Sequence, residues 1–104
     1  MGRGDGGEDR VRFLRALAFE IRRKRPAAEA MAECIESEGR GGRHRQWRQT
    51  TVVLESDGFV PALVTGGMLG EEAAAVLASV ADSGDHRLLS AALAALADFQ
   101  ERQG

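Results

Sequence analysis

Four consecutive cations, Arg22-Arg23-Lys24-Arg25, are the most concentrated source of chemistry in this 104-residue chain. A basic run of this kind attracts acidic protein surfaces, phosphate or anionic lipid headgroups, and a membrane surface contributes roughly 1 kcal/mol per well-placed charge. The plainer alternative is a solvated helix end that binds nothing. We predict that these four residues form an edge that faces a partner protein or a membrane.

Four carboxylates in the second half of the chain carry the opposite charge: Glu71, Glu72, Asp82 and Asp85. Residues 1–52 hold 12 Lys and Arg against 8 Asp and Glu, whereas residues 53–104 hold 2 against 8. This polarity favours pairing of an acidic with a basic surface, within one chain or between copies. We therefore predict an acidic counter-surface at the four carboxylates. They lack the alternating oxygen ligands of a calcium loop, so no metal site is predicted.

A second group of arginines surrounds Trp47: Arg40, Arg43, Arg45 and Arg48. Arginines near an aromatic residue can bind a phosphate backbone. The alternative prediction is therefore that the protein is a small helical regulator that binds nucleic acid through residues 40–48. The sequence pI near 5.7 is low for a dedicated nucleic-acid binder, and no helix-turn-helix pattern stands out.

Catalytic chemistry has little support in the sequence. His44 and His86 lie in polar segments without a histidine or cysteine at metal-ligand spacing, and the glycine clusters match no phosphate-binding loop. Cys34 is the one cysteine, and with Met31 and Ile35 it lies on an apolar helix face. We expect it to be a buried hydrophobe rather than a reactive thiol. The chain is predicted to be no enzyme and to need no cofactor.

The elements that position these residues are predicted to be helices. The apolar residues are mostly Ala, Leu and Val, aromatic residues make up only 5%, and apolar positions recur at helical spacing. We predict an all-α fold, a six-helix bundle of short antiparallel hairpins, over residues 9–104, after a flexible tail at residues 1–8. The helices are expected near residues 9–24, 26–39, 43–56, 59–64, 70–82 and 86–102.

Helical periodicity also predicts which side chains are buried. The first helix turns one apolar stripe inward: Val11, Leu14, Leu17, Ala18 and Ile21. On the third helix either Thr50 or Thr51 points inward, and on the fifth either Val76 or Leu77 does. The sixth helix is expected to bury this stripe: Leu89, Ala92, Leu93, Leu96 and Phe99.

Two turns separate helices in a recognisable way. Gly84 suits the left-handed residue that follows a helix, and Asp85 suits the cap of the next helix. Residues 80–85 therefore predict a tight helical hairpin. Arg25 precedes Pro26, and the residue before a proline is disfavoured in the helical conformation, so the first helix is expected to end there.

The order of these features resembles the cytoplasmic domain of the F-protein family of type II secretion and type IV pilus systems. Phe13-Leu14-Arg15-Ala16-Leu17-Ala18 matches the opening Phe-x-Arg-x-Leu-Ala motif of that family. Four later segments correspond to its proline turn, its Gly-x-Leu-x-x-Ala-Leu segment, its Gly-Glu-x-Ser-Gly turn and its closing helix: residues 25–31, 57–63, 80–85 and 93–100. The resemblance covers roughly residues 10–102.

Three positions depart from the family pattern. The basic pair Lys24-Arg25 stands where the family has a glycine at its first turn. Met68-Leu69 replaces a Phe-Pro pair, and Asp82 is the nearest counterpart of the turn glutamate. The chain is therefore expected to be a divergent member.

The resemblance implies a function. Members of the family are inner-membrane platform proteins, in which such six-helix domains precede membrane-spanning segments and couple an assembly ATPase to the addition of pilin subunits. We accordingly expect a non-enzymatic scaffold that contacts the ATPase and partner subunits and forms a homodimer. The sequence itself contains no membrane-spanning stretch and no signal peptide, so a cytoplasmic location, at the inner membrane if the protein is longer, is predicted.

Overall fold

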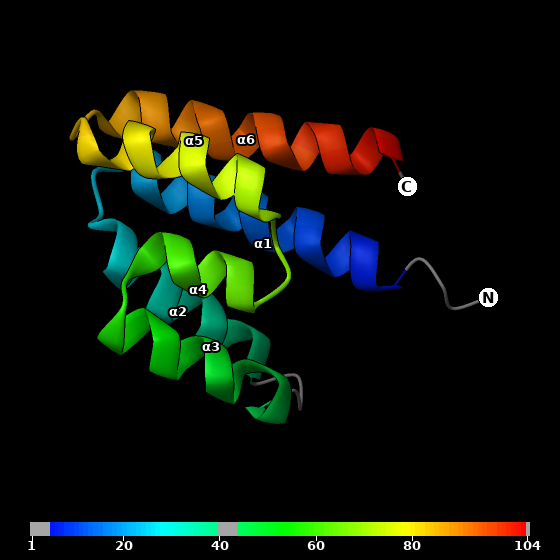
Figure 1. The fold of residues 1–104 in the computed structure, drawn as a ribbon. Helices are drawn as coiled ribbons and strands as arrows, with labels where there is room; N and C mark the ends of the chain where they lie inside the picture. The colour runs from blue at the N-terminus through cyan, green and yellow to red at the C-terminus, as the bar shows by residue number, and fades with distance from the viewer. Residues whose placement is uncertain (1–4, 40–43, 104) are drawn as a thin grey trace.

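The computed structural model of this chain describes residues 5–39 and 44–103. Over these residues the secondary structure is six helices and no strand, which confirms the predicted all-α fold (Figure 1). The helices are α1 (Asp5–Arg22), α2 (Ala27–Gly39), α3 (His44–Ser56), α4 (Phe59–Thr65), α5 (Glu71–Asp82) and α6 (His86–Gln103).

The boundaries of the first helix differ from the prediction. Helix α1 begins at Asp5, so it includes four residues that were expected to belong to the tail. It also ends at Arg22, two residues before the expected end at Lys24. The reason for the early end is the backbone of Lys24, whose φ of 69° is left-handed and cannot continue a right-handed helix.

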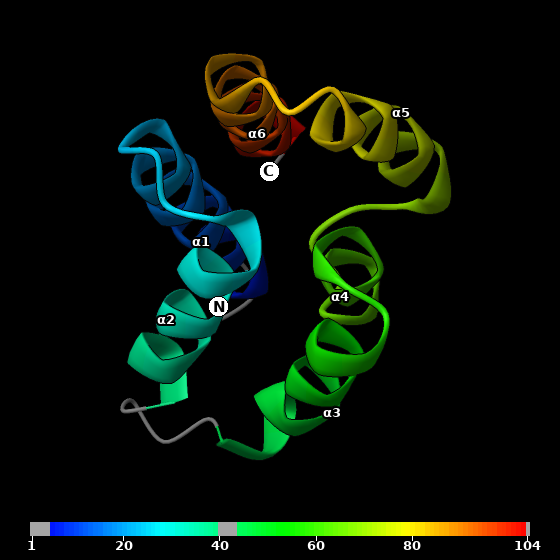
Figure 2. The ribbon, with the colours of Figure 1, turned by 90° about the vertical axis from the view of Figure 1, so that its left-hand side faces the viewer.

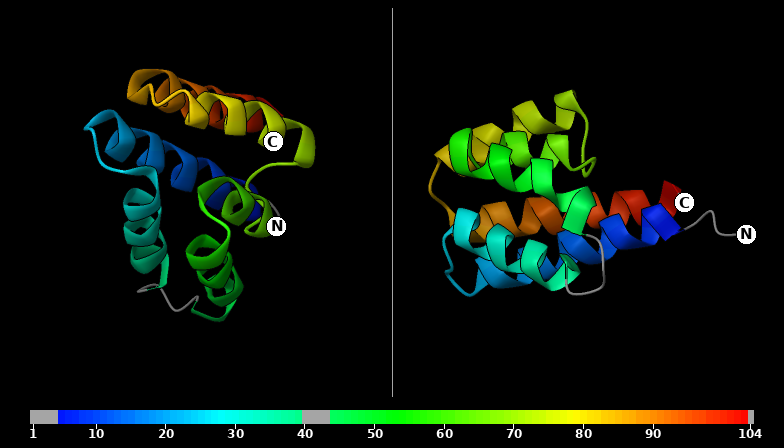
Figure 3. Two further views of the ribbon diagram at one scale, coloured as in Figure 1. Left: turned by 60° about the vertical axis from the view of Figure 1, so that its left-hand side comes forward. Right: turned by 90° about the horizontal axis from the view of Figure 1, so that it is seen from below.

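Consecutive helices run antiparallel and follow one another around a ring (Figures 1 and 2). Helix α6 closes the ring by lying along α1, and these two helices make the most extensive contact in the fold. The hairpin of α2 and α3 extends away from α1, α5 and α6, as the rotated views show (Figure 3). The Cα radius of gyration is 12.7 Å, the value expected for a compact chain of this length.

The contact between α1 and α6 forms the centre of the core. Leu14, Leu17 and Ile21 on α1 are fully buried, as predicted, and so is Leu93 on α6. The hydroxyl of Ser90 is also buried, and it donates a hydrogen bond of 2.8 Å to the carbonyl oxygen of Ala18. This bond satisfies the one buried polar side chain of α6 that faces α1 and helps to hold the two helices in register.

Charged side chains pair across the rim of the same contact. Arg15 on α1 lies 2.8 Å from Asp98 and 2.6 Å from Glu101, both on α6. The hydrogen bonds to Glu101 and then Asp98 raise the pKa of the Arg15 guanidinium. The basic first half and the acidic second half of the chain are thus partly neutralised within one chain, one of the two pairings that the charge polarity allowed.

Aromatic and small residues fix the position of α3. The ring of Trp47 stacks on Phe13 of α1, with centroids 4.9 Å apart and planes inclined by 14°. Of the two candidate threonines, Thr50 is the buried one, at 1% exposure. A Cβ at Gly66 would lie 3.3 Å from the Thr50 hydroxyl, so a glycine at this position permits the end of α4 to approach α3 closely.

The predicted inward stripe of α6 is wrong at Phe99, which is 54% exposed. The helix instead buries Leu89, Leu93 and Ala97, a row at intervals of four residues. Phe99 lies two residues after Ala97, more than half a turn around the helix, and therefore faces outward. On α5 the buried residue is Leu77, at 1% exposure.

Candidate partner-binding site

Three turns lie at one end of the bundle, the left end in Figure 1, and are spaced around the ring that Figure 2 shows. They are the α1–α2, α3–α4 and α5–α6 connections, which share this end because successive helices run antiparallel. The basic run at residues 22–25 belongs to the first of these turns, and Asp82 and Asp85 flank the third. Arg22, Lys24 and Asp85 line the same shallow hollow.

The predicted acidic counter-surface is divided by the fold. Glu71 and Glu72 are exposed in the first turn of α5, where the helix dipole favours negative charge. Asp82 is the last residue of the same helix, whose 12 residues span about 18 Å. Asp82 and Asp85 therefore lie at the same end of the bundle as the basic run, with Asp85 beside it, whereas the two glutamates lie at the opposite end.

Lys24 holds an unusual backbone conformation in the basic run. Its φ is 69°, and it is the only residue other than glycine with a positive φ in the described part of the chain. Its backbone N–H donates to the carbonyl oxygen of Ile21 at 2.8 Å and so closes the end of α1. A left-handed conformation costs a non-glycine residue roughly 1–2 kcal/mol, which is why glycine is the usual residue here.

The four cations of the run have different surroundings. The guanidinium of Arg25 bonds to Glu33 and lies 3.3 Å from Glu20, so it links α2 to α1. The bond to Glu33 raises the pKa of Arg25 and lowers the pKa of the Glu33 carboxyl. The guanidinium of Arg23 lies over the ring of Phe19, with 5.5 Å between the Arg23 Cζ atom and the ring centroid.

Arg22 and Lys24 are the two cations of the run that contact neither a carboxylate nor an aromatic ring within the described residues. Both are exposed, and neither forms an ion pair within the described residues. We therefore take these two, rather than all four predicted cations, as the basic edge of the site.

The α5–α6 turn has the geometry that the sequence predicted. Gly84 has φ 77°, in the left-handed region that glycine tolerates, and ends α5. The carboxylate of Asp85 accepts hydrogen bonds from the backbone N–H groups of Arg87 at 3.0 Å and Leu88 at 3.1 Å. Asp85 is thus the N-cap of α6, and these bonds satisfy two donors that the first turn of a helix leaves unpaired.

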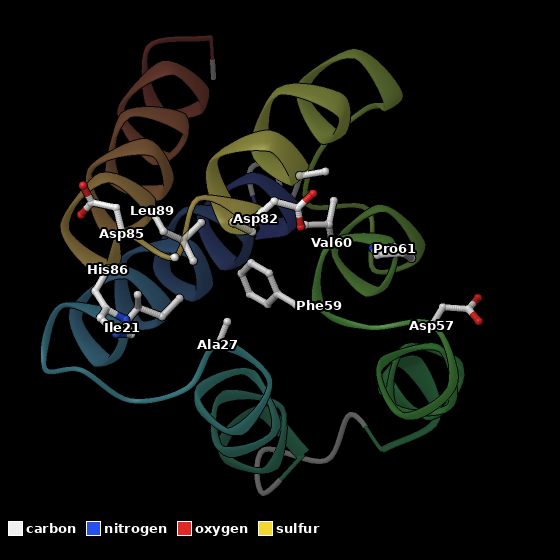
Figure 4. Close-up of a pocket in the computed structure, with 13 residues that line it drawn as sticks. Ile21, Ala27, Asp57, Phe59, Val60, Pro61, Asp82, Asp85, His86 and Leu89 are labelled. Atoms are coloured by element: carbon white, nitrogen blue, oxygen red, sulfur yellow. The ribbon is translucent and has the colours of Figure 1, made fainter.

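A hollow of about 380 Å³ opens beside this turn (Figure 4). Its apolar lining includes Ile21 of α1, Phe59 of α4 and Leu89 of α6. Asp82 and Asp85 lie at its rim. No sequence pattern predicts this hollow, because its walls come from segments that are far apart along the chain.

The segment of the nucleic-acid alternative is only partly described. Arg40 and Arg43 lie outside the described residues, as does the side chain of Arg45, and Arg48 is exposed. Trp47 is buried, at 9% exposure, and stacks on Phe13. Its ring serves the core, so it is not presented to a base or a phosphate.

Cys34 has the properties of a structural thiol. It is half-buried on α2, and burial, followed by the nearby carboxylates of Glu20, Glu33 and Glu38, raises its pKa to about 11. Because the thiolate is the reactive form, the rate of alkylation by iodoacetamide near neutral pH should be about a hundredfold below that of a free cysteine. The alkylation rate of the folded protein, measured against pH, should rise only toward pH 11. Unfolding in urea should restore the ordinary rate, and a folded-state rate that titrates near the ordinary thiol pKa would contradict the assignment.

The described residues contain no group of three or more His, Cys, Asp or Glu side chains arranged to hold a metal ion. His86 is exposed, and the side chain of His44 lies outside the described residues. None of the described helices combines the length and apolar character needed to cross a membrane. Comparison with protein-family models, curated proteins and solved structures finds no match to this chain.

Proposed function

We propose that this chain is a non-enzymatic scaffold domain of a type II secretion or type IV pilus platform, and that it contacts the assembly ATPase and partner subunits at the turn end of its bundle. The observation that carries the proposal is that Arg22 and Lys24, which have no ion pair within the described residues, lie beside the α5–α6 turn. Lys24 keeps a left-handed backbone at a position where a glycine would be unstrained. Strain of this kind persists most often where a side chain serves a function.

The proposal takes the family from the sequence resemblance, and residues of the resembling motifs have structural roles in the fold. Phe13, Leu17 and Ala18 of the opening motif are buried, and Arg15 pairs with α6. The late turn contributes Gly84 and Asp85, which end one helix and cap the next. The described part of the chain has six helices, the number that the resemblance implies.

The homodimer is part of the same proposal. One face of α6 exposes an apolar stripe at helical spacing: Leu88, Ala91, Ala95 and Phe99. Val76 on the adjacent helix α5 is 66% exposed. A stripe of this kind is suited to packing against a second copy, because the contact would remove apolar surface from water. In the platform, this domain would lie at the cytoplasmic face of the inner membrane.

Charge reversal tests the basic edge. The double variant Arg22→Glu, Lys24→Glu should lose at least about tenfold in affinity for the assembly ATPase of the same organism, because two attractive charges become repulsive. The affinity can be measured with purified proteins by biolayer interferometry. The matched control is Arg10→Glu with Arg48→Glu, which reverses two exposed charges on α1 and α3 and should change the affinity by less than about twofold.

Two results would contradict the proposal. The first is a wild-type chain that binds neither the ATPase nor any platform subunit of its organism. The second is an equal loss of affinity in the edge variant and the control variant, which would show a general charge effect rather than a site.

A further inference from the structure

We propose that the hollow between α1, α4 and the α5–α6 turn receives an apolar side chain from a partner segment that carries lysines or arginines around that side chain. This inference rests on the proposed function only in that the chain acts by binding other proteins. It assigns the partner chemistry of a second hollow, which adjoins the one lined by Arg22 and Lys24 and shares Asp85 with it.

The floor of the hollow is apolar and preformed. Ile21, Phe59 and Leu89 are between 0% and 8% exposed and come from three different helices, so the core holds them in place (Figure 4). Ala78 and Ala81 line the hollow from α5 at positions three residues apart, on one side of that helix. Their small side chains leave the space open. A volume of about 380 Å³ falls within the range of pockets that bind ligands and accommodates one large apolar side chain.

The rim of the hollow is acidic. Asp57, Asp82 and Asp85 line it; the carboxylate of Asp82 points across the hollow toward Val60, whereas those of Asp57 and Asp85 lie at its outer edge and point away from it (Figure 4). None of the three forms an ion pair within the described residues, and Asp85 is engaged only in capping α6. Among the lining residues the only other titratable side chain is His86. Arg22 and Lys24 line the neighbouring hollow instead.

Charge complementarity therefore selects the occupant. The charged side chains among the lining residues are all acidic, and none of them has an ion pair in the described part of the chain, so they repel an acidic segment and attract a basic one. The occupant that fits is an amphipathic segment with an apolar anchor and flanking cations, bound by the anchor in the hollow and by the cations at the rim.

A synthetic peptide provides the test. The probe is a short amphipathic helix with leucines on one face and lysines on the other, titrated into the isotopically labelled full chain and followed by NMR. The amide signals of residues 57–61 and 81–89 should shift. A peptide with glutamates in place of the lysines, and one with alanines in place of the leucines, should each bind at least about tenfold more weakly.

Two pairs of variants locate the binding. The double variant Asp82→Asn, Asp85→Asn removes two rim charges, while asparagine at residue 85 can still cap α6. Its affinity for the lysine peptide should be about tenfold lower than that of the wild type. Its control is Glu71→Gln with Glu72→Gln, at the other end of α5. Ala81→Leu should fill the hollow and abolish binding, whereas Ala75→Leu, exposed on the same helix, should not. Circular dichroism checks that each variant folds.

Any of three outcomes would overturn the inference. The lysine and glutamate peptides bind with equal affinity, the lysine peptide binds a folded Ala81→Leu variant as tightly as the wild type, or the amide signals that shift belong only to the outer face of α6. Signals from the hollow that change with protein concentration alone would identify a second copy as the occupant. The ATPase assay depends on Arg22 and Lys24 and the peptide assay on Asp82, Asp85 and Ala81. Failure of one proposal is thus distinguishable from failure of the other.

Discussion

Replacing Leu17 with alanine is expected to lower the free energy of unfolding by about 3 kcal/mol. The side chain of Leu17 is fully buried in the core that α1 shares with α6. Its truncation removes apolar contacts and leaves a cavity that the packed helices can only partly close. Urea denaturation followed by far-UV circular dichroism measures the change, and the loss is a large fraction of the total stability of a small domain.

The matched control is Phe19→Ala, two residues further along α1. Phe19 is larger than Leu17 but 58% exposed, and its main partner is the guanidinium of Arg23. Its truncation should cost less than about 1 kcal/mol, the scale of an exposed cation–π contact. If the two substitutions destabilise the protein equally, the inward face assigned to α1 is wrong.

Replacing Lys24 with glycine is expected to raise the free energy of unfolding by about 1 kcal/mol, although it deletes a charge from the proposed binding edge. The gain comes from the backbone, since glycine adopts a φ of 69° without the steric cost that a Cβ imposes. The larger freedom of glycine in the unfolded chain offsets part of it. Thermal and urea unfolding measure the gain.

Lys24→Ala separates the backbone effect from the charge effect. Alanine keeps the Cβ and therefore the strain, so its stability should remain within about 0.5 kcal/mol of the wild type. Both variants remove the ammonium group and should weaken ATPase binding to the same extent. A glycine variant that is no more stable than the alanine variant would contradict the left-handed conformation of this residue. A glycine variant that binds as well as the wild type would remove Lys24 from the proposed edge.

Much of the fold could be predicted from local pattern. The apolar stripe of α1 and the two residues of the α5–α6 turn, Gly84 and Asp85, were identified correctly, because periodicity and capping depend on neighbours within about one helical turn. Phe99 was misplaced since two apolar stripes compete on α6, and local periodicity alone does not say which one meets α1. The packing of Leu93 and Ala97 against the core decides between them.

The candidate site was predictable only in part. The sequence marked Arg22 and Lys24 as members of a basic run, but it could not separate them from Arg25, whose charge is used in bonds to Glu20 and Glu33. The left-handed backbone of Lys24 also had no sequence signal, because lysine is not a residue that favours it.

By itself the sequence determined the helices, the turns between them and most of the inward faces, since these follow from the conformational preferences and spacing of adjacent residues. Only the tertiary structure decided which turns share an end of the bundle. Antiparallel packing brings Asp82 and Asp85 to the end of the bundle that holds the basic run and carries Glu71 and Glu72 to the far end of α5. The same packing creates the acidic-rimmed hollow, because its floor exists only where α1, α4 and α6 meet.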